Sequence, residues 1–213
     1  MCGETLISSG GAGNGKLFLL FSQMQSLLNR FLFLSQGGVG VTDVVDRGNN
    51  WFRDAEARGA QICGIDGSVL SINNFEPLFI MQQAHDAYIL GLLDAVPVLC
   101  RTAIEEELTI RYLAANNLIQ QVAAGTPFRT FIDGTTPATL ENLIQWAVRT
   151  NPPILTSATE VLARDVQKAG NDYAHAYAMR RAGRPMAGAG NVFSNTKALD
   201  VYQNTLKVLN QMS

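Results

Sequence analysis

The sequence predicts a mainly α-helical protein with a glycine-rich N-terminal extension. From residue 75 onward, apolar side chains recur every three or four residues between proline, serine and threonine boundaries, which is the pattern of amphipathic helices. Before residue 75, glycines are frequent, which is typical of turns and loops. Hydrophobic residues make up 47% of the chain and the net charge is −2, so an intrinsically disordered chain is excluded. We therefore place an N-terminal extension at residues 1–74 and a helical domain at residues 75–213.

The composition restricts the classes of function. Only 16% of the residues are charged and the balance is slightly acidic, which excludes a wholly basic nucleic-acid coat but allows a local basic patch. Three widely separated cysteines (Cys2, Cys63 and Cys100) and two histidines predict neither a disulfide framework nor a metal site. We expect no metal, no cofactor and a cytoplasmic location. A surface with so few charges favours a homo-oligomer.

Within the extension we expect one helix and two short strands. The strands are predicted at Val39–Val45 and Gln61–Ile65, where apolar residues lie between glycines. The apolar run Leu17–Leu34 is close to the minimum length of a membrane span. Polar residues recur along it at helical spacing: Ser22, Ser26, Asn29 and Arg30. The run therefore predicts an amphipathic helix that packs on a core or a partner, and no membrane association.

The segment Gly10–Lys16 satisfies the glycine and lysine spacing of a phosphate-binding loop. The next residue is Leu17, where such a loop needs a Ser or Thr to hold Mg²⁺. This departure favours a flexible lead into a helix, and nucleotide binding stays as an alternative.

The helical domain is predicted to contain five helices. Prolines and N-capping residues set their starts, and glycines or prolines set their ends. The expected ranges are Phe75–Asp94, Pro97–Ala115, Thr136–Val148, Thr156–Arg181 and a last helix from Ser194 to Leu209.

The helix at 156–181 carries the strongest candidate site. Four polar residues fall on one side of it, opposite a predicted core stripe that includes Leu162 and Val166. These residues are Arg164, Lys168, Asn171 and His175, and further basic residues follow at Arg180, Arg181 and Arg184. An ordinary solvated helix face is the alternative interpretation.

Gly170 lies in the middle of the same helix. A glycine there costs about 1 kcal/mol relative to alanine. We therefore expect another backbone or a partner to approach the helix closely at this position.

The helix at 97–115 contains two charge pairs at i, i+4 spacing, Arg101 with Glu105 and Glu107 with Arg111. The second pair lies close to the expected core face. We predict that at least one pair is partly buried and fixes the register of the helix, although ordinary surface ion pairs are the alternative.

Two of these segments resemble HEPN-like domains, in particular the group known as DUF4145. The segment Val98–Leu108 is similar to the first core helix of that group, and Gly170–His175 is similar to the Gly-Asn-x-x-Ala-His end of its signature helix. The resemblance covers residues 78–212. It implies a bundle of four or five helices that pairs as a homodimer.

The resemblance also implies a function. HEPN ribonucleases cleave RNA without metal through an Arg-x4-His motif, in which His175 matches the histidine and Gly170 occupies the place of the arginine. In a catalytic protein, His175 is the acid or base, Asn171 orients the phosphate, and Arg164 or Lys168 stabilises charge. Arg180 and Arg181 would add contacts to RNA. Without the motif arginine, non-catalytic RNA binding gains weight.

We thus expect a HEPN-like homodimer that binds or processes RNA in a prokaryotic stress or antiviral defence system, if catalytic as a metal-independent endoribonuclease. RNA and a partner protein are the expected partners. The alternative is a structural scaffold that oligomerises, in which the polar side from Arg164 to His175 is a contact between subunits.

Overall fold

The computed structural model describes residues 41–63, 74–120, 128–181 and 194–212. In these ranges the chain is mainly helical and contains no strand, only an isolated antiparallel bridge between Thr130 and Pro137. The predicted mainly α-helical class is therefore confirmed. Contacts divide the chain into two units, residues 1–63 and 64–213, which we describe separately. The predicted boundary after residue 74 stays a prediction, as do the roles of Gly10–Lys16 and Leu17–Leu34, which lie outside the described residues.

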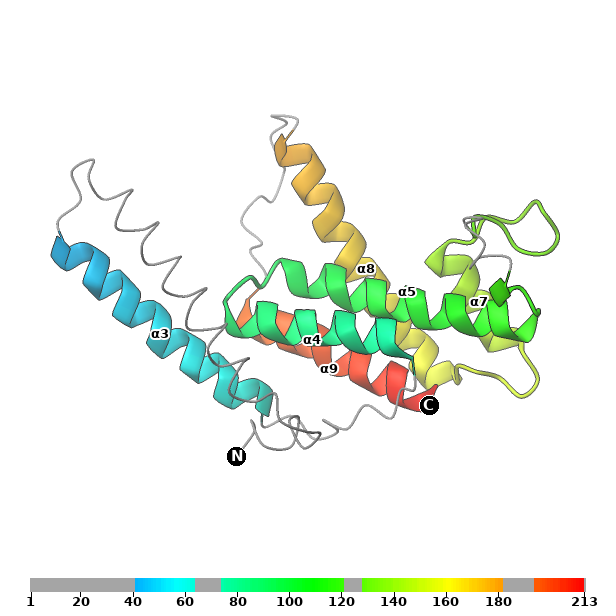
Figure 1. The fold of residues 1–213 in the computed structure, drawn as a ribbon, viewed down its shortest axis with the longest axis horizontal. Helices are drawn as coiled ribbons and strands as arrows, with labels where there is room; N and C mark the ends of the chain where they lie inside the picture. The colour runs from blue at the N-terminus through cyan, green and yellow to red at the C-terminus, as the bar shows by residue number, and fades with distance from the viewer. Residues whose placement is uncertain (1–40, 64–73, 121–127, 182–193, 213) are drawn as a thin grey trace. The chain divides into compact units, whose positions relative to one another are not determined.

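In the first unit, the two predicted strands are wrong where they can be examined. Residues 41–63 form one helix, α3 (Val41–Cys63), which includes most of Val39–Val45 and the start of Gln61–Ile65 (Figure 1). The predictions overweighted the glycines. An apolar period of three or four residues runs through Gly48 and Gly59, and Ile62 near the end of α3 is 5% exposed.

Cys63, the last residue of α3, is disulfide-bonded. The number and spacing of the cysteines did not predict this bond. The expected cytoplasmic location stays a prediction. No helix in the described ranges is both long enough and apolar enough to cross a membrane.

The described part of the second unit contains five named helices, and their positions overlap the predicted ranges (Figure 1). They are α4 (Phe75–Ile89), α5 (Ala95–Ala115), α7 (Leu140–Arg149), α8 (Ser157–Arg181) and α9 (Asn195–Gln211). Ser194 caps α9 as predicted, because its hydroxyl accepts a hydrogen bond from the backbone N–H of Lys197 at 3.2 Å.

The main difference is the end of α4, which stops five residues before the predicted Asp94. Gly91 has a φ of +77°, a left-handed conformation that ends the helix. Glycine suits this position because L side chains rarely adopt that conformation. Its N–H bonds the carbonyl of Tyr88 at 3.0 Å, and the N–H of Leu92 bonds the carbonyl of Ala87 at 2.8 Å. These two bonds form a Schellman motif.

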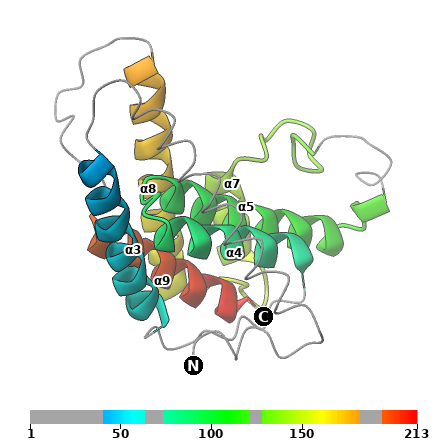
Figure 2. The ribbon, with the colours of Figure 1, turned by 60° about the vertical axis from the view of Figure 1, so that its left-hand side comes forward.

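Helix α5 is the centre of this unit, because it packs against α4, α7, α8 and α9. Its Cys100, Ala103, Ile104 and Leu108 are fully buried. Figures 1 and 2 show α4, α5 and α9 side by side, whereas the C-terminal end of α8 extends away from them.

Gly170 is where α8 meets α5, as the sequence predicted. A Cβ built on Gly170 would lie 2.8 Å from the Cβ of Arg101 and 2.9 Å from the backbone oxygen of Pro97. Both atoms belong to α5 and neither is the free end of a flexible side chain. Glycine is therefore required for the two helices to approach this closely.

Gly170→Ala is expected to lower the free energy of unfolding by about 1–3 kcal/mol, the usual cost of overpacking, despite the higher helix propensity of alanine. Urea denaturation followed by circular dichroism measures this change. Gly59→Ala is the matched control, because a Cβ at that interior position of α3 meets no atom within 4 Å. An equal or higher stability of Gly170→Ala would show that the two helices are not in tight contact there.

Candidate functional site

The polar side of α8 is only partly described. Lys168 is exposed, Asn171 is half-buried and the Arg164 side chain is 36% exposed. His175, Arg180 and Arg181 lie in the C-terminal part of α8. The side chains of residues 175–181 are outside what the structure describes, so their predicted roles stay predictions. Arg184 lies outside the described residues altogether.

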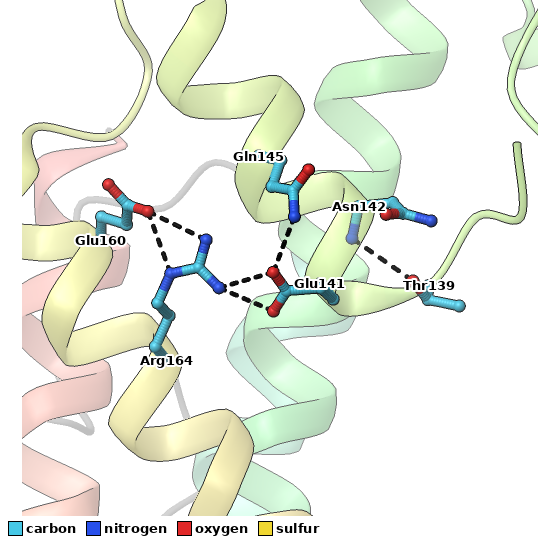
Figure 3. A network of polar contacts seen from close by, with 6 residues as sticks. All are labelled: Thr139, Glu141, Asn142, Gln145, Glu160 and Arg164. Carbon is cyan, nitrogen blue, oxygen red and sulfur yellow. Dashed lines mark hydrogen bonds and ion pairs between the residues drawn. The ribbon is translucent and has the colours of Figure 1, made fainter.

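Arg164 is held by two carboxylates (Figure 3). Its Nη1 donates to Oε1 and Oε2 of Glu141 in α7, at 2.6 and 2.7 Å. Its Nε and Nη2 lie 3.0 and 2.9 Å from Oε1 of Glu160, one turn earlier in α8. The guanidinium thus joins α7 to α8 in a charge-assisted network.

The amides of two glutamines complete this network. Gln145, one turn after Glu141 in α7, donates to Oε1 of Glu141 at 2.8 Å (Figure 3). The oxygen and nitrogen of the Gln167 amide are assigned so that both form hydrogen bonds. The nitrogen then donates to Oε2 of Glu141 at 3.2 Å, and the oxygen accepts from the backbone N–H of Glu141 at 3.3 Å. That N–H belongs to the first turn of α7, where no carbonyl of the helix is available to it.

The electrostatics of the network follow from these contacts. The hydrogen bonds from Arg164 hold the pKa of Glu141 below its usual value, and those to Glu141 and Glu160 raise the pKa of Arg164. A carboxylate in the first turn of α7 also interacts favourably with the helix dipole. Arg164 therefore acts as a bridge between helices, and a phosphate would have to displace two carboxylates to reach it.

The partners of Arg164 were missed at the sequence level. Glu160 could have been found, because it precedes Arg164 by four residues in the same helix. Glu141 could not, because it is 23 residues earlier in the chain and only the packing of α7 on α8 brings the two together. Of the three residues on the predicted polar side whose side chains are described, Arg164 is the one in an ion-pair network.

The two charge pairs of α5 differ in how deeply they are buried. Arg111 Nε lies 2.6 Å from Oε1 of Glu107, whose side chain is 1% exposed, so this pair is partly buried as predicted. The second oxygen of Glu107 accepts a hydrogen bond from Nδ2 of Asn74 at 2.8 Å, which ties the start of α4 to α5. The pair of Arg101 and Glu105, 3.2 Å apart, is partly exposed.

Two further features of the described residues bear on chemistry, namely their metal-ligating side chains and the thiol of Cys100. Those residues contain no group of three or more His, Cys, Asp or Glu side chains that could hold a metal ion. Burial raises the pKa of the Cys100 thiol to about 12, so this thiol is not a nucleophile at neutral pH.

Comparison with known proteins gives no relative of this chain. No family model, no curated protein and no solved structure matches it. The resemblance to HEPN-like domains therefore rests on the sequence motifs alone.

The ion pairs of Arg164 should make the stability of the fold depend on pH. Because the pKa of Glu141 is lowered on folding, its contribution to stability is present above the usual value of 4.5 and is lost as the pH falls through the lower folded-state pKa. We expect Glu141→Gln to cost about 1 kcal/mol at pH 7, since both side chains are partly exposed. The cost should shrink as the pH falls below 4.5 and through the folded-state pKa of Glu141, as measured by urea denaturation at each pH.

Asp165→Asn is the matched control, because Asp165 is exposed on the same helix and has no described ion-pair partner. It should leave the free energy of unfolding at pH 7 close to that of the wild type. An identical pH dependence in the wild type and in Glu141→Gln would contradict the assignment.

Proposed function

We propose that the helical domain binds RNA through the C-terminal part of α8, as a homodimer of HEPN-like type in a prokaryotic stress or defence system. The observation that carries this proposal is the charge at one end of the helix. Residues 168–181 contain three basic residues, Lys168, Arg180 and Arg181, against the single acidic Asp172. This end of α8 extends away from the other helices of its unit (Figure 2).

A helix with this charge suits the phosphate backbone of RNA. Basic side chains that neutralise phosphates release counterions, and this release drives binding without reading the sequence. Lys168 supports this role because it is exposed and has no ion-pair partner among the described residues. A purely structural role is the competing account, since Arg180 and Arg181 also stabilise a helix C-terminus through its dipole.

Two observations favour binding without cleavage. The motif arginine of HEPN ribonucleases falls at Gly170, where even a Cβ would collide with α5. Arg164, one of the two basic residues suggested in its place, is held by Glu141 and Glu160. Of the cations suggested for stabilising charge in a reaction, Lys168 is the one without a described carboxylate partner. We therefore propose that the protein binds RNA without cleaving it, and a metal-independent endoribonuclease is the second candidate function.

The affinity for RNA is expected to fall steeply with salt. The triple variant Lys168→Gln/Arg180→Gln/Arg181→Gln should bind a labelled single-stranded RNA more weakly. Its plot of log affinity against log salt should be shallower by about 2, because each phosphate that is no longer neutralised reduces the slope by about 0.7. Fluorescence anisotropy at several salt concentrations measures both quantities.

The matched control is Lys197→Gln/Lys207→Gln, which removes two exposed cations from α9. It should leave affinity and slope close to those of the wild type. Equal losses in the two variants would contradict a site on α8. Assembly that is insensitive to salt, without RNA binding, would support the scaffold alternative.

Cleavage is tested separately by incubating the protein with a mixed RNA pool in EDTA, with His175→Ala beside the wild type. We expect intact RNA in both samples, because the arginine of the motif is absent. Cleavage that survives chelation and disappears in His175→Ala would contradict the non-catalytic proposal and establish a metal-independent ribonuclease.

A further inference from the structure

An apolar patch lies on the exposed side of the first two turns of α4. Phe75, Leu78 and Phe79 are 70%, 40% and 48% exposed. The rings of Phe75 and Phe79 are stacked, with centroids 5.9 Å apart and planes inclined by 13°. The opposite side of the helix contributes Met81 and Ala84 to the core, at 1% and 0% exposed. The three exposed residues therefore form a surface that is separate from the core.

Negative charge lies at the edge of this patch. Glu76 is in the first turn of α4, and Glu106 is in α5, which packs alongside α4 (Figure 1). Burial, together with the carboxylates of Glu105 and Glu76, raises the pKa of Glu106. Glu105 is paired with Arg101. Within the described residues, Glu76 and Glu106 have no such cation, so the edge of the patch carries uncompensated negative charge.

We propose that the patch of Phe75, Leu78 and Phe79, with Glu76 and Glu106 at its edge, binds an amphipathic helical segment of a partner protein that carries Lys or Arg beside its apolar side chains. The spacing of the three apolar residues, i, i+3 and i+4, is that of a helix face that packs against another helix. Cations of the partner would neutralise the two carboxylates and fix the orientation of the segment.

The negative charge at the edge of the patch argues against two other occupants, a second copy of the chain and an anionic membrane. In a symmetric dimer the same surface of both copies would meet, so the carboxylates of one copy would lie near those of the other. An anionic membrane surface would be repelled by the same carboxylates. An amphipathic helix with cationic side chains can both pack on the apolar residues of the patch and neutralise the carboxylates at its edge.

The test uses the full-length protein and two fluorescein-labelled peptides of 18 residues, an amphipathic Leu/Lys helix and its Leu/Glu counterpart. Anisotropy should detect binding of the Leu/Lys peptide, and at least about tenfold weaker binding of the Leu/Glu peptide. The variant Phe75→Ser/Phe79→Ser should weaken binding of the Leu/Lys peptide at least about tenfold. Glu76→Lys should also weaken it, and more strongly at low salt.

Val161→Ser is the matched control, because it removes a side chain that is 58% exposed on α8, outside the patch. It should bind the Leu/Lys peptide as the wild type does. Equal binding of the two peptides, or equal affinity of Val161→Ser and the double phenylalanine variant, would overturn the proposal.

Sedimentation velocity and vesicle flotation test the other occupants. A dimer that dissociates in the Phe75→Ser/Phe79→Ser variant would show that a second copy of the chain covers the patch, and would overturn the proposal. Binding to phosphatidylserine vesicles that the same variant abolishes would overturn it in favour of a lipid surface. An oligomeric state that is the same in the wild type and in the Phe75→Ser/Phe79→Ser variant, together with no flotation and with binding of the Leu/Lys peptide by the wild type, would support it.

Discussion

The close packing of α8 on α5 at Gly170 is the contact on which the helical unit depends. Because no side chain separates the helices there, the backbone of Pro97 and the stem of Arg101 lie directly against α8. Helix α5 in turn packs against every other named helix of the unit, and its buried residues form the centre of the core. Gly170 therefore sets how closely α8 approaches α5, and further contacts with α7 and α9 complete the placement of α8.

The same packing decides which polar residues remain available for a ligand. Arg164 lies opposite α7 and is bound by Glu141 and Glu160, so it stabilises the arrangement of helices. Lys168, one turn further along, has no such partner among the described residues. The candidate nucleic-acid surface therefore begins where the network ends, toward the C-terminus of α8. The buried Glu107 has a comparable structural role between α4 and α5.

The helices of the second unit could be predicted because local signals agree with the tertiary structure. Proline and serine mark their starts, and apolar residues recur at helical spacing between these marks. Helix α3 was missed because Gly48 and Gly59 were given too much weight as turn residues, although the apolar period of the helix runs through both positions. The close approach at Gly170 was predictable, because glycine within a helix is costly unless something requires it. The binding of Arg164 by Glu141 was not, because that contact depends on the packing of two separate helices.

Native-state hydrogen exchange of the full-length protein tests the central role of α5 most directly. We expect the amides of Ile104 and Leu108 to exchange slowest, through global unfolding, because α5 is buried by four neighbouring helices. Within α8, the amides of residues 163–170 should be well protected, and those after residue 174 should exchange much faster through local opening. Amides of α5 that exchange as fast as those at the C-terminal end of α8 would contradict the account.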